Sequence, residues 1–221
     1  MKSSFFSQFI LALAGFLFIF SVSVVLVLNF RPLYYYDMKA MHLAETNQMS
    51  EEEIKENYDT LISYNSVFYQ GELDFPTLPM SREGRIHFQE VKQIFDCIQI
   101  LLIISLLLFF PGATYSIVKK KKWAFLNLIP CITGIVLLFI IFQALMDWDG
   151  FFTTFHHLLF QNDYWLFDPA TDPVINLLPD EFFFHCLVGI AGIMTLLMAF
   201  CVLAAQILKR HMSSDGCLSR K

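Results

Sequence analysis

The residues best suited to chemistry in this sequence are histidines that stand beside aromatic and acidic side chains. Two of the six histidines, His156 and His157, are adjacent in the aromatic segment from Phe151 to Phe184, which contains no Lys or Arg. Histidine titrates near neutral pH, so it can accept a proton and also donate one. A single such histidine is more often structural than catalytic. A group of them beside carboxylates favours general acid–base catalysis, and the other candidates are His42, His87 and His185.

Other reaction types find little support in the sequence. There is no HExxH motif and no close set of Cys and His, so we predict no metal site and no cofactor. Adjacent helical residues such as His156 and His157 point about 100° apart, which disfavours their sharing one ion. There is no GxSxG motif, no P-loop and no folded basic patch for nucleic acid. Cys186 is the remaining candidate for a nucleophile, although a buried cysteine usually only packs.

The elements that position these histidines are expected to be membrane-spanning helices. Of the 221 residues, 56% are hydrophobic, and 25 are Phe. Soluble domains average about 45–50% apolar residues and lack long apolar runs. Four apolar runs here are long enough to cross a bilayer as helices: residues 5–30, 94–118, 123–146 and 182–208. We therefore predict an all-α membrane protein, with residues 1–221 forming a single integral membrane domain.

The basic residues set the predicted orientation of the spans. One side of the four spans carries Lys2, Lys119 to Lys122, Lys209, Arg210, Arg220 and Lys221, with Asp215 as its one acid. Positively charged loops stay in the cytoplasm. Both termini and the turn at residues 119–122 are therefore predicted to be cytoplasmic. Residues 31–93 and 147–181 then face outward, and we predict that these two outer loops form an extracellular cap.

Local signals predict a helix in the cap and the depth of one histidine. Ser50 followed by Glu53 is a capping box for a helix that runs to about Tyr64. Its apolar stripe needs a surface to cover and consists of Ile54, Tyr58, Leu61 and Ile62. If the second span continues upward as a helix, His87 stands about two turns, roughly 10 Å, above Ile94. That position is at or just above the membrane–water interface.

A second outer helix is expected over residues 151–161, with Asp149 as its N-cap. It should lie in the interface with its apolar face toward the lipid. This face consists of Phe151, Phe152, Phe155, Leu158 and Leu159. His156 lies on the flank of the apolar face, and His157 points away from it.

The stretch FHHLLFQNDYWLFDPATDPVINLLPDEFF, together with GRIHFQEVK before the second span, resembles the lipoprotein intramolecular transacylase family of Gram-positive bacteria. The resemblance covers the whole arrangement of spans and loops. It implies an enzyme that moves the sn-2 acyl chain of a diacylglyceryl-cysteine to the α-amine of the same cysteine, giving a lyso-form lipoprotein. It also implies a location in the bacterial cell membrane, with the active site facing outward. The partners would be membrane-anchored diacylglyceryl lipoproteins and the lipid bilayer.

The resemblance places the catalytic histidines at His87 and within the pair His156 and His157. The polar face of His157 favours it slightly, whereas a base on the flank beside the acyl chains would be His156. The nucleophile would be the substrate's own amine, whose pKa of about 7.7–8.0 allows a neutral histidine to remove its proton. Side chains that hold the substrate and exclude water are expected at Phe155, Asn162, Tyr164 and Trp165.

Two alternatives belong to other classes of protein. In the first, the protein is a non-enzymatic scaffold or accessory subunit whose cap binds a partner and whose histidines only pack. In the second, it is an N-acyltransferase that takes its acyl chain from phospholipid through an acyl-enzyme. The mass of a model lipoprotein before and after incubation, with each acyl chain located by fragmentation, distinguishes these hypotheses.

Overall fold

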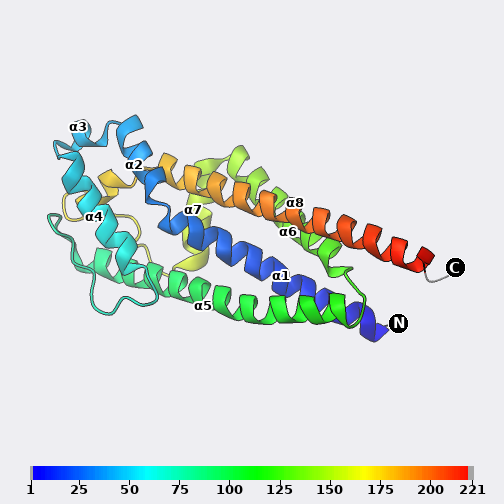
Figure 1. The fold of residues 1–221 in the computed structure, drawn as a ribbon. Coiled ribbons are helices and arrows are strands. Elements are labelled where there is room, and N and C mark those ends of the chain that lie inside the picture. The colour runs from blue at the N-terminus through cyan, green and yellow to red at the C-terminus, as the bar shows by residue number, and fades with distance from the viewer. Residues whose placement is uncertain (1, 219–221) are drawn as a thin grey trace. The chain divides into compact units, whose positions relative to one another are not determined.

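The computed structural model describes residues 2–218, with side chains for residues 5–211, and within that range every regular element is a helix (Figure 1). The all-α prediction is therefore confirmed. The chain falls into two compact units. One contains residues up to 23, 101–142 and from 190 onward, and the other contains residues 24–100 and 143–189. Each unit has its own hydrophobic core.

Among the described residues, four helices are long and apolar enough to cross a membrane, as predicted: α1 (Lys2–Asn29), α5 (Arg82–Val118), α6 (Phe125–Met146) and α8 (Asp180–Leu218). The 37 residues of α5 span about 55 Å, whereas the hydrocarbon core of a bilayer is about 30 Å thick. The apolar part of α5 begins at Ile94. His87 lies about two turns before this apolar part.

The first unit contains a helical core with one buried polar cluster. Ile19 of α1 packs there with Phe125 and Ile129 of α6, and all three are almost fully buried. Nε2 of the buried Gln8 donates to the hydroxyl of Ser116 at 2.9 Å, and its Oε1 accepts from the Phe125 N–H at 3.3 Å. This amide is thus satisfied inside the helices. None of the candidate site residues belongs to this unit.

The second unit is built around stacked aromatic rings. Its own helices are α2 (Arg31–Ala40), α3 (Leu43–Asn47), α4 (Glu51–Tyr64), α7 (Trp148–Leu159) and the 3₁₀ helix η1 (Pro173–Leu177). The rings of Tyr34 and Tyr58 stack with centroids 3.6 Å apart, and Phe182 meets Tyr34 edge-on at 5.2 Å. The Tyr34 hydroxyl also donates to the Leu177 carbonyl at 2.9 Å. One aromatic core thus joins α2, α4, η1 and the start of α8.

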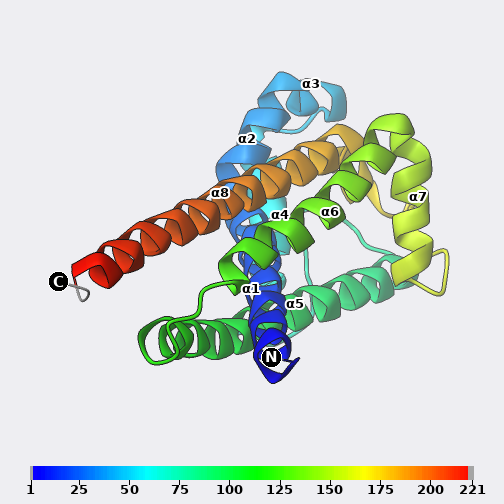
Figure 2. The ribbon, with the colours of Figure 1, turned by 90° about the vertical axis from the view of Figure 1, so that its right-hand side faces the viewer.

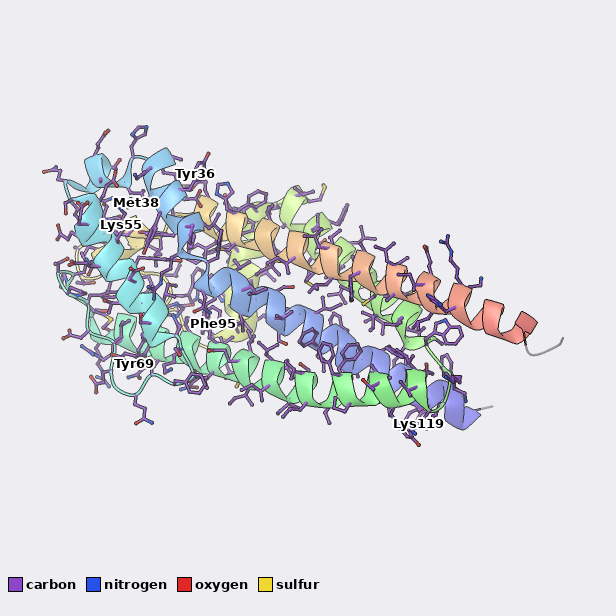
Figure 3. All side chains as sticks on the ribbon, viewed as in Figure 1. Tyr36, Met38, Lys55, Tyr69, Phe95 and Lys119 are labelled. Atoms are coloured by element: carbon purple, nitrogen blue, oxygen red, sulfur yellow. The ribbon has the colours of Figure 1, made fainter. Side chains whose placement is uncertain are left out.

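Helix α4 forms as the sequence predicts. The Ser50 hydroxyl accepts from the Glu53 N–H at 3.1 Å, and the helix ends at Tyr64. Its predicted apolar stripe is buried, and it consists of Ile54, Tyr58, Leu61 and Ile62. The stripe packs into the same core as Met38 of α2, which is 1% exposed, while Tyr36 on the outer side of α2 is 70% exposed (Figure 3).

The structure differs from the sequence predictions at the helices that follow α1 and at the start of α7. The helices α2 and α3 were not predicted. Pro32 stands in the first turn of α2, where a backbone N–H has no helical partner, so the N–H that proline lacks is not missed. A helix therefore starts again directly after Phe30. The prediction of Asp149 as the cap of the outer helix was wrong. The Asp147 carboxylate accepts from the Gly150 N–H at 3.0 Å, so α7 starts at Trp148 and Asp149 lies in its first turn.

The start of α5 is fixed by a buried carboxylate from a distant loop. Oδ1 of Asp172, a residue that is 3% exposed, accepts from the Ser81 N–H at 2.7 Å. The Ser81 hydroxyl in turn accepts from the Gly84 N–H at 2.9 Å. A Cβ atom at Gly84 would overlap the Asp172 carboxylate and press on the ring of Phe167. The absence of a side chain at Gly84 therefore allows the loop after α7 to pack directly against the helix that carries His87.

Candidate active site

His87 lies in the second turn of α5 and is 6% exposed. Its ring packs against Phe160 and Phe167, with centroids 4.7 and 5.3 Å away. Burial lowers the pKa of His87 to about 4, and the nearby His156 adds to the effect. The imidazole is therefore neutral at pH 7. Its Nδ1 atom is buried without a hydrogen-bond partner among the described residues, which leaves this atom available to a bound molecule.

His156 lies in the last turn of α7, and its ring centroid is 6.3 Å from that of His87. Its Nδ1 lies 2.7 Å from the Phe152 carbonyl. A carbonyl can only accept, so Nδ1 carries the proton and Nε2 of the neutral ring is free to act as a base. The indole of Trp165 stacks on the His156 ring, with the two centroids 4.6 Å apart. Burial lowers the pKa of His156, while the Phe152 carbonyl and the Asp180 carboxylate oppose this shift.

His157 is exposed and does not contact His87 in the described structure. Its ring meets Trp165 edge-on at 5.4 Å, so it reaches the border of the site through that indole. The two adjacent histidines thus take different positions because of their helical spacing. The structure brings His156, rather than His157, toward His87.

The end of α7 turns the chain back onto α5. Phe160 adopts an extended backbone, with φ −116° and ψ 137°, and its side chain is buried against His87. In the loop that follows, Asn162 Nδ2 donates to Glu90 Oε1 at 2.8 Å, and Asn162 Oδ1 accepts from the Tyr164 N–H at 3.1 Å. Figure 2 shows the end of α7 and the yellow loop meeting the start of α5. This turn carries His156 and Trp165 to His87.

The residues predicted to contact substrate lie at different distances from His87 and His156. Trp165 stacks on His156, and Asn162 is bonded to the helix that carries His87. Phe155 meets His156 edge-on at 5.6 Å but is 47% exposed, as befits the outward apolar face of α7. Tyr164 is exposed at the rim. Trp165, Phe155 and Tyr164 thus form an aromatic border around the two imidazoles, and Asn162 is the polar member of the set.

Such a site can perform acid–base chemistry on a substrate with apolar chains. The neutral imidazole of His156 can take up a proton and return it, and the neutral ring of His87 has an N–H to donate. Aromatic side chains surround the two rings, and apolar side chains of α7 beside the site are exposed. Comparison with known proteins shows the family to which the chain belongs. A model of the family "Lipoprotein intramolecular transacylase Lit" matches residues 9–183 of the chain.

This chain belongs to the lipoprotein intramolecular transacylase family. It is similar to the membrane integral lipoprotein intramolecular transacylase from Bacillus cereus, solved in meso, with 33% identity, a TM-score of 0.92, and 96% of this chain and 99% of that chain covered. Two further structures of the Bacillus cereus protein, with a histidine replaced by arginine or by alanine, match with 34% and 31% identity and TM-scores of 0.86 and 0.84. They cover 96% and 98% of this chain, and 95% and 96% of theirs. A search of curated proteins found no match.

Membership in the lipoprotein intramolecular transacylase family confirms the prediction of an acyltransferase embedded in a membrane. It does not by itself assign the site residues. The geometry adds four residues that were not predicted: Glu90, Phe160, Phe167 and Asp180. For Glu90 a sequence signal existed, because it follows His87 by three residues on one helix and residues at this spacing are neighbours on a helix surface. No local signal pointed to the others, since each reaches the site through a turn or through a separate element.

One more histidine of this transacylase takes a different position. Nδ1 of His185, at the start of α8, lies 2.9 Å from a carboxylate oxygen of the fully buried Asp37 in α2. The pair links two elements of the same unit. His185 also borders an open depression of about 520 Å³ next to Asp180 and Trp148. The Asp180 carboxylate is close enough to His156 to oppose the lowering of its pKa by burial. This depression therefore adjoins the candidate active site.

Proposed function

We propose that this transacylase moves the sn-2 acyl chain of a diacylglyceryl lipoprotein to the α-amine of the lipidated cysteine, giving the lyso form. The observation that carries the proposal is the pair of neutral imidazoles of His87 and His156, 6.3 Å apart within aromatic walls. Family membership supplies the class of substrate. The position of His87 just beyond the apolar part of α5 fits an ester that lies at the surface of a bilayer.

In the proposed reaction the substrate supplies its own nucleophile. The neutral α-amine attacks the carbonyl carbon of the sn-2 ester, and a new N–C bond forms. Nε2 of His156 takes one proton from the nitrogen, and the resulting imidazolium returns this proton to the glyceryl oxygen as the ester C–O bond breaks. The neutral ring of His87 has one N–H, which it would donate to the oxyanion of the tetrahedral intermediate. The products are an amide and a free sn-2 hydroxyl in one molecule.

His157 is the alternative to His156 as the base. It is exposed, and it meets the site through Trp165. The position of the half-buried His156 next to His87 and the fixed proton on its Nδ1 favour His156. The Bacillus cereus structures in which a histidine is substituted support a role for histidine in this family, and the substituted position there is close in number to His87 here.

We further propose that the active site faces outward from the bacterial cell membrane and that both termini are cytoplasmic. The turn of residues 119–122 contains four lysines. The second unit, which contains His87 and His156, is rich in carboxylates and holds the predicted cap segments 31–93 and 147–181. Positively charged turns favour the cytoplasm, so the proposed cap would be extracellular.

An acyl-enzyme through Cys186 is the second candidate mechanism. Its side chain packs against the core around Tyr34 and Tyr58. Among the described residues, no hydrogen bond joins a histidine to its sulfur, as an activated thiol would require. These contacts support direct attack by the amine of the substrate.

A crossover experiment tests the proposed function. Two diacylglyceryl-cysteine peptides are mixed with the protein in phospholipid vesicles, one peptide carrying isotopically heavy acyl chains and the other a distinguishable sequence. Each product should keep its own chains and the mass of its parent, with one chain relocated to nitrogen. Heavy chains on the light peptide, or labelled phospholipid acyl groups on either amine, would exclude the intramolecular route. Cys186→Ala would then be the first variant to examine.

A further inference from the structure

Glu90 is a charged side chain at the site that the mechanism above does not use. It lies one helical turn after His87 on α5. Its Oε1 accepts from Asn162 Nδ2 at 2.8 Å. Its Oε2 is buried and has no hydrogen-bond partner among the described residues. Half of this carboxylate is therefore held in place, and the other half is left open inside the protein.

Among the residues that the structure describes, no salt bridge joins a lysine or arginine to this carboxylate. The salt bridges of the described lysines and arginines go to other acids, and the two within reach of α5 pair Arg85 with Glu72 and Lys92 with Asp96. A buried carboxylate oxygen that lacks a partner costs stability, because the hydration it had in the unfolded chain is lost. An oxygen that is held open in this way is suited to a hydrogen-bond donor that arrives with a ligand.

The orientation of Glu90 is set from the opposite side of the site. Asn162 has one choice of amide orientation, because its oxygen accepts from the Tyr164 N–H at 3.1 Å and its nitrogen must then face Glu90. The same loop continues into Trp165, which stacks on His156. Glu90 is thus fixed between the helix of His87 and the loop that packs on His156.

We infer that Glu90 is the binding group for the α-amine of the substrate cysteine, which it receives on Oε2. This inference rests on the proposed function. The amine of the substrate is a hydrogen-bond donor, and its nitrogen becomes positively charged as it attacks the ester carbonyl. A carboxylate beside that nitrogen stabilises the developing charge more strongly than the neutral imidazole of His156, because the carboxylate carries a negative charge. The carboxylate also selects substrates with a free amine over products, whose nitrogen is an uncharged amide.

The variant that tests this role is Glu90→Gln. It keeps the shape of the side chain and an oxygen for Asn162 but removes the charge. Glu83→Gln is the matched control, because Glu83 is an exposed acid in the first turn of the same helix. Binding is measured in detergent micelles with three lipopeptides: a diacylglyceryl-cysteine peptide with a free amine, its N-acetylated form, and a des-amino analogue. The kinetic parameters kcat and KM are measured with the free-amine peptide, and the melting temperature is recorded for each variant.

The parent and Glu83→Gln should bind the free-amine peptide about tenfold more tightly than either analogue, as one charge-assisted hydrogen bond gives. In Glu90→Gln this preference should disappear and kcat/KM should fall by about 10- to 100-fold, with an unchanged melting temperature. If Glu90 had only a structural role, Glu90→Gln would have a lower melting temperature and would bind all three peptides more weakly, by the same factor. Retained preference for the free amine in Glu90→Gln would overturn the assignment.

The parent alone also provides a test if Glu90→Gln does not fold. Equal binding of the free-amine and des-amino peptides by the parent would show that no carboxylate receives the amine, and the inference would be wrong. Failure of the proposed function has a different signature, because the parent would then form no lyso product from the free-amine peptide. Normal conversion with equal rates in the parent and in Glu90→Gln would overturn the role of Glu90 alone.

Discussion

The imidazole rings of His87 and His156 lie 6.3 Å apart with an angle of 31° between their planes, and the ring of Phe160 packs on both. No hydrogen bond joins these two described side chains, and Nδ1 of His156 is bound to the backbone. Each histidine therefore presents a nitrogen that its neighbour does not occupy. A reacting ester between them would have a base on one side and a hydrogen-bond donor on the other.

Replacement of the histidines by alanine should separate three positions that are close in sequence or in space. We expect His156→Ala to lower the rate of transacylation by about 10²- to 10⁴-fold, the usual weight of an acid–base group. His87→Ala should lower it by about 10²- to 10³-fold, as the loss of a donor to the oxyanion does. His157→Ala should have a much smaller effect, because its ring reaches only the edge of Trp165. The measurement is the initial rate of lyso-peptide formation by mass spectrometry.

His42→Ala serves as a control, since His42 is an exposed residue of the cap segment. All variants should extract from the membrane and melt like the parent. A large loss in His157→Ala with full activity in His156→Ala would reverse the choice within the pair. Full activity in both His87→Ala and the double variant His156→Ala/His157→Ala would exclude histidine catalysis at this site.

The buried state of His87 should make stability depend on pH. The pKa of His87 is lowered to about 4 in the folded protein, whereas histidine in an unfolded chain titrates at about 6.5. Between these values only the unfolded state binds the proton, so the free energy of unfolding falls as the pH decreases from 6.5 toward 4. The contribution is at most about 3 kcal/mol. This part of the free energy of unfolding is fully present above pH 6.5.

Melting temperatures of the parent and of His87→Gln between pH 4 and pH 8 measure this contribution. The parent should lose more stability than the variant as the pH falls, because Gln does not titrate. Other titrating groups, such as Asp180 and His156, are common to both proteins and cancel in the comparison. Parallel curves would show that His87 is not the group responsible.

Gly84→Ala should destabilise the protein although alanine is the better helix former. A Cβ atom at this position would overlap the carboxylate of Asp172, which holds the Ser81 N–H, and would press on Phe167 beside His87. Overpacking of this kind costs about 1–3 kcal/mol. We therefore expect a lower melting temperature and a lower rate of transacylation.

Gly134→Ala is the matched control for this substitution, because no atom lies within 4 Å of a Cβ atom at Gly134 in α6. That change should be neutral or slightly stabilising, in line with the preference of helices for alanine. If Gly84→Ala melts at or above the temperature of Gly134→Ala, the packing of Asp172 against α5 is not as tight as described.

The proposed orientation predicts which positions an impermeant thiol reagent reaches in intact cells. In a background without cysteine, single cysteines at Glu52 and at Asp163 should react, because both residues are exposed in the proposed extracellular cap. A cysteine at Lys120, in the turn between α5 and α6, should react only after the cells are permeabilised. Labelling at Lys120 in intact cells would contradict the orientation.

The sequence by itself determined the features that depend on neighbouring residues along the chain. Apolar runs of sufficient length defined the four long helices, because a helix satisfies its backbone internally wherever it lies. The capping residue Ser50 and the stripe from Ile54 to Ile62 defined α4 for the same local reason. The histidine-rich aromatic segment pointed to acid–base chemistry, and its sequence resembled that of the lipoprotein intramolecular transacylase family. These signals placed His87 and the pair His156–His157 among the candidates.

The tertiary structure decided which of these candidates meet. His156 and His157 differ by about 100° around α7, and only the turn at Phe160 determines which of them faces α5. The contact of Glu90 with Asn162 joins residues 72 positions apart. The pKa of His87 follows from the burial of its ring among residues of other elements. Spacing along a chain carries no information about such contacts, because they form only when separate helices and loops pack together and exclude water.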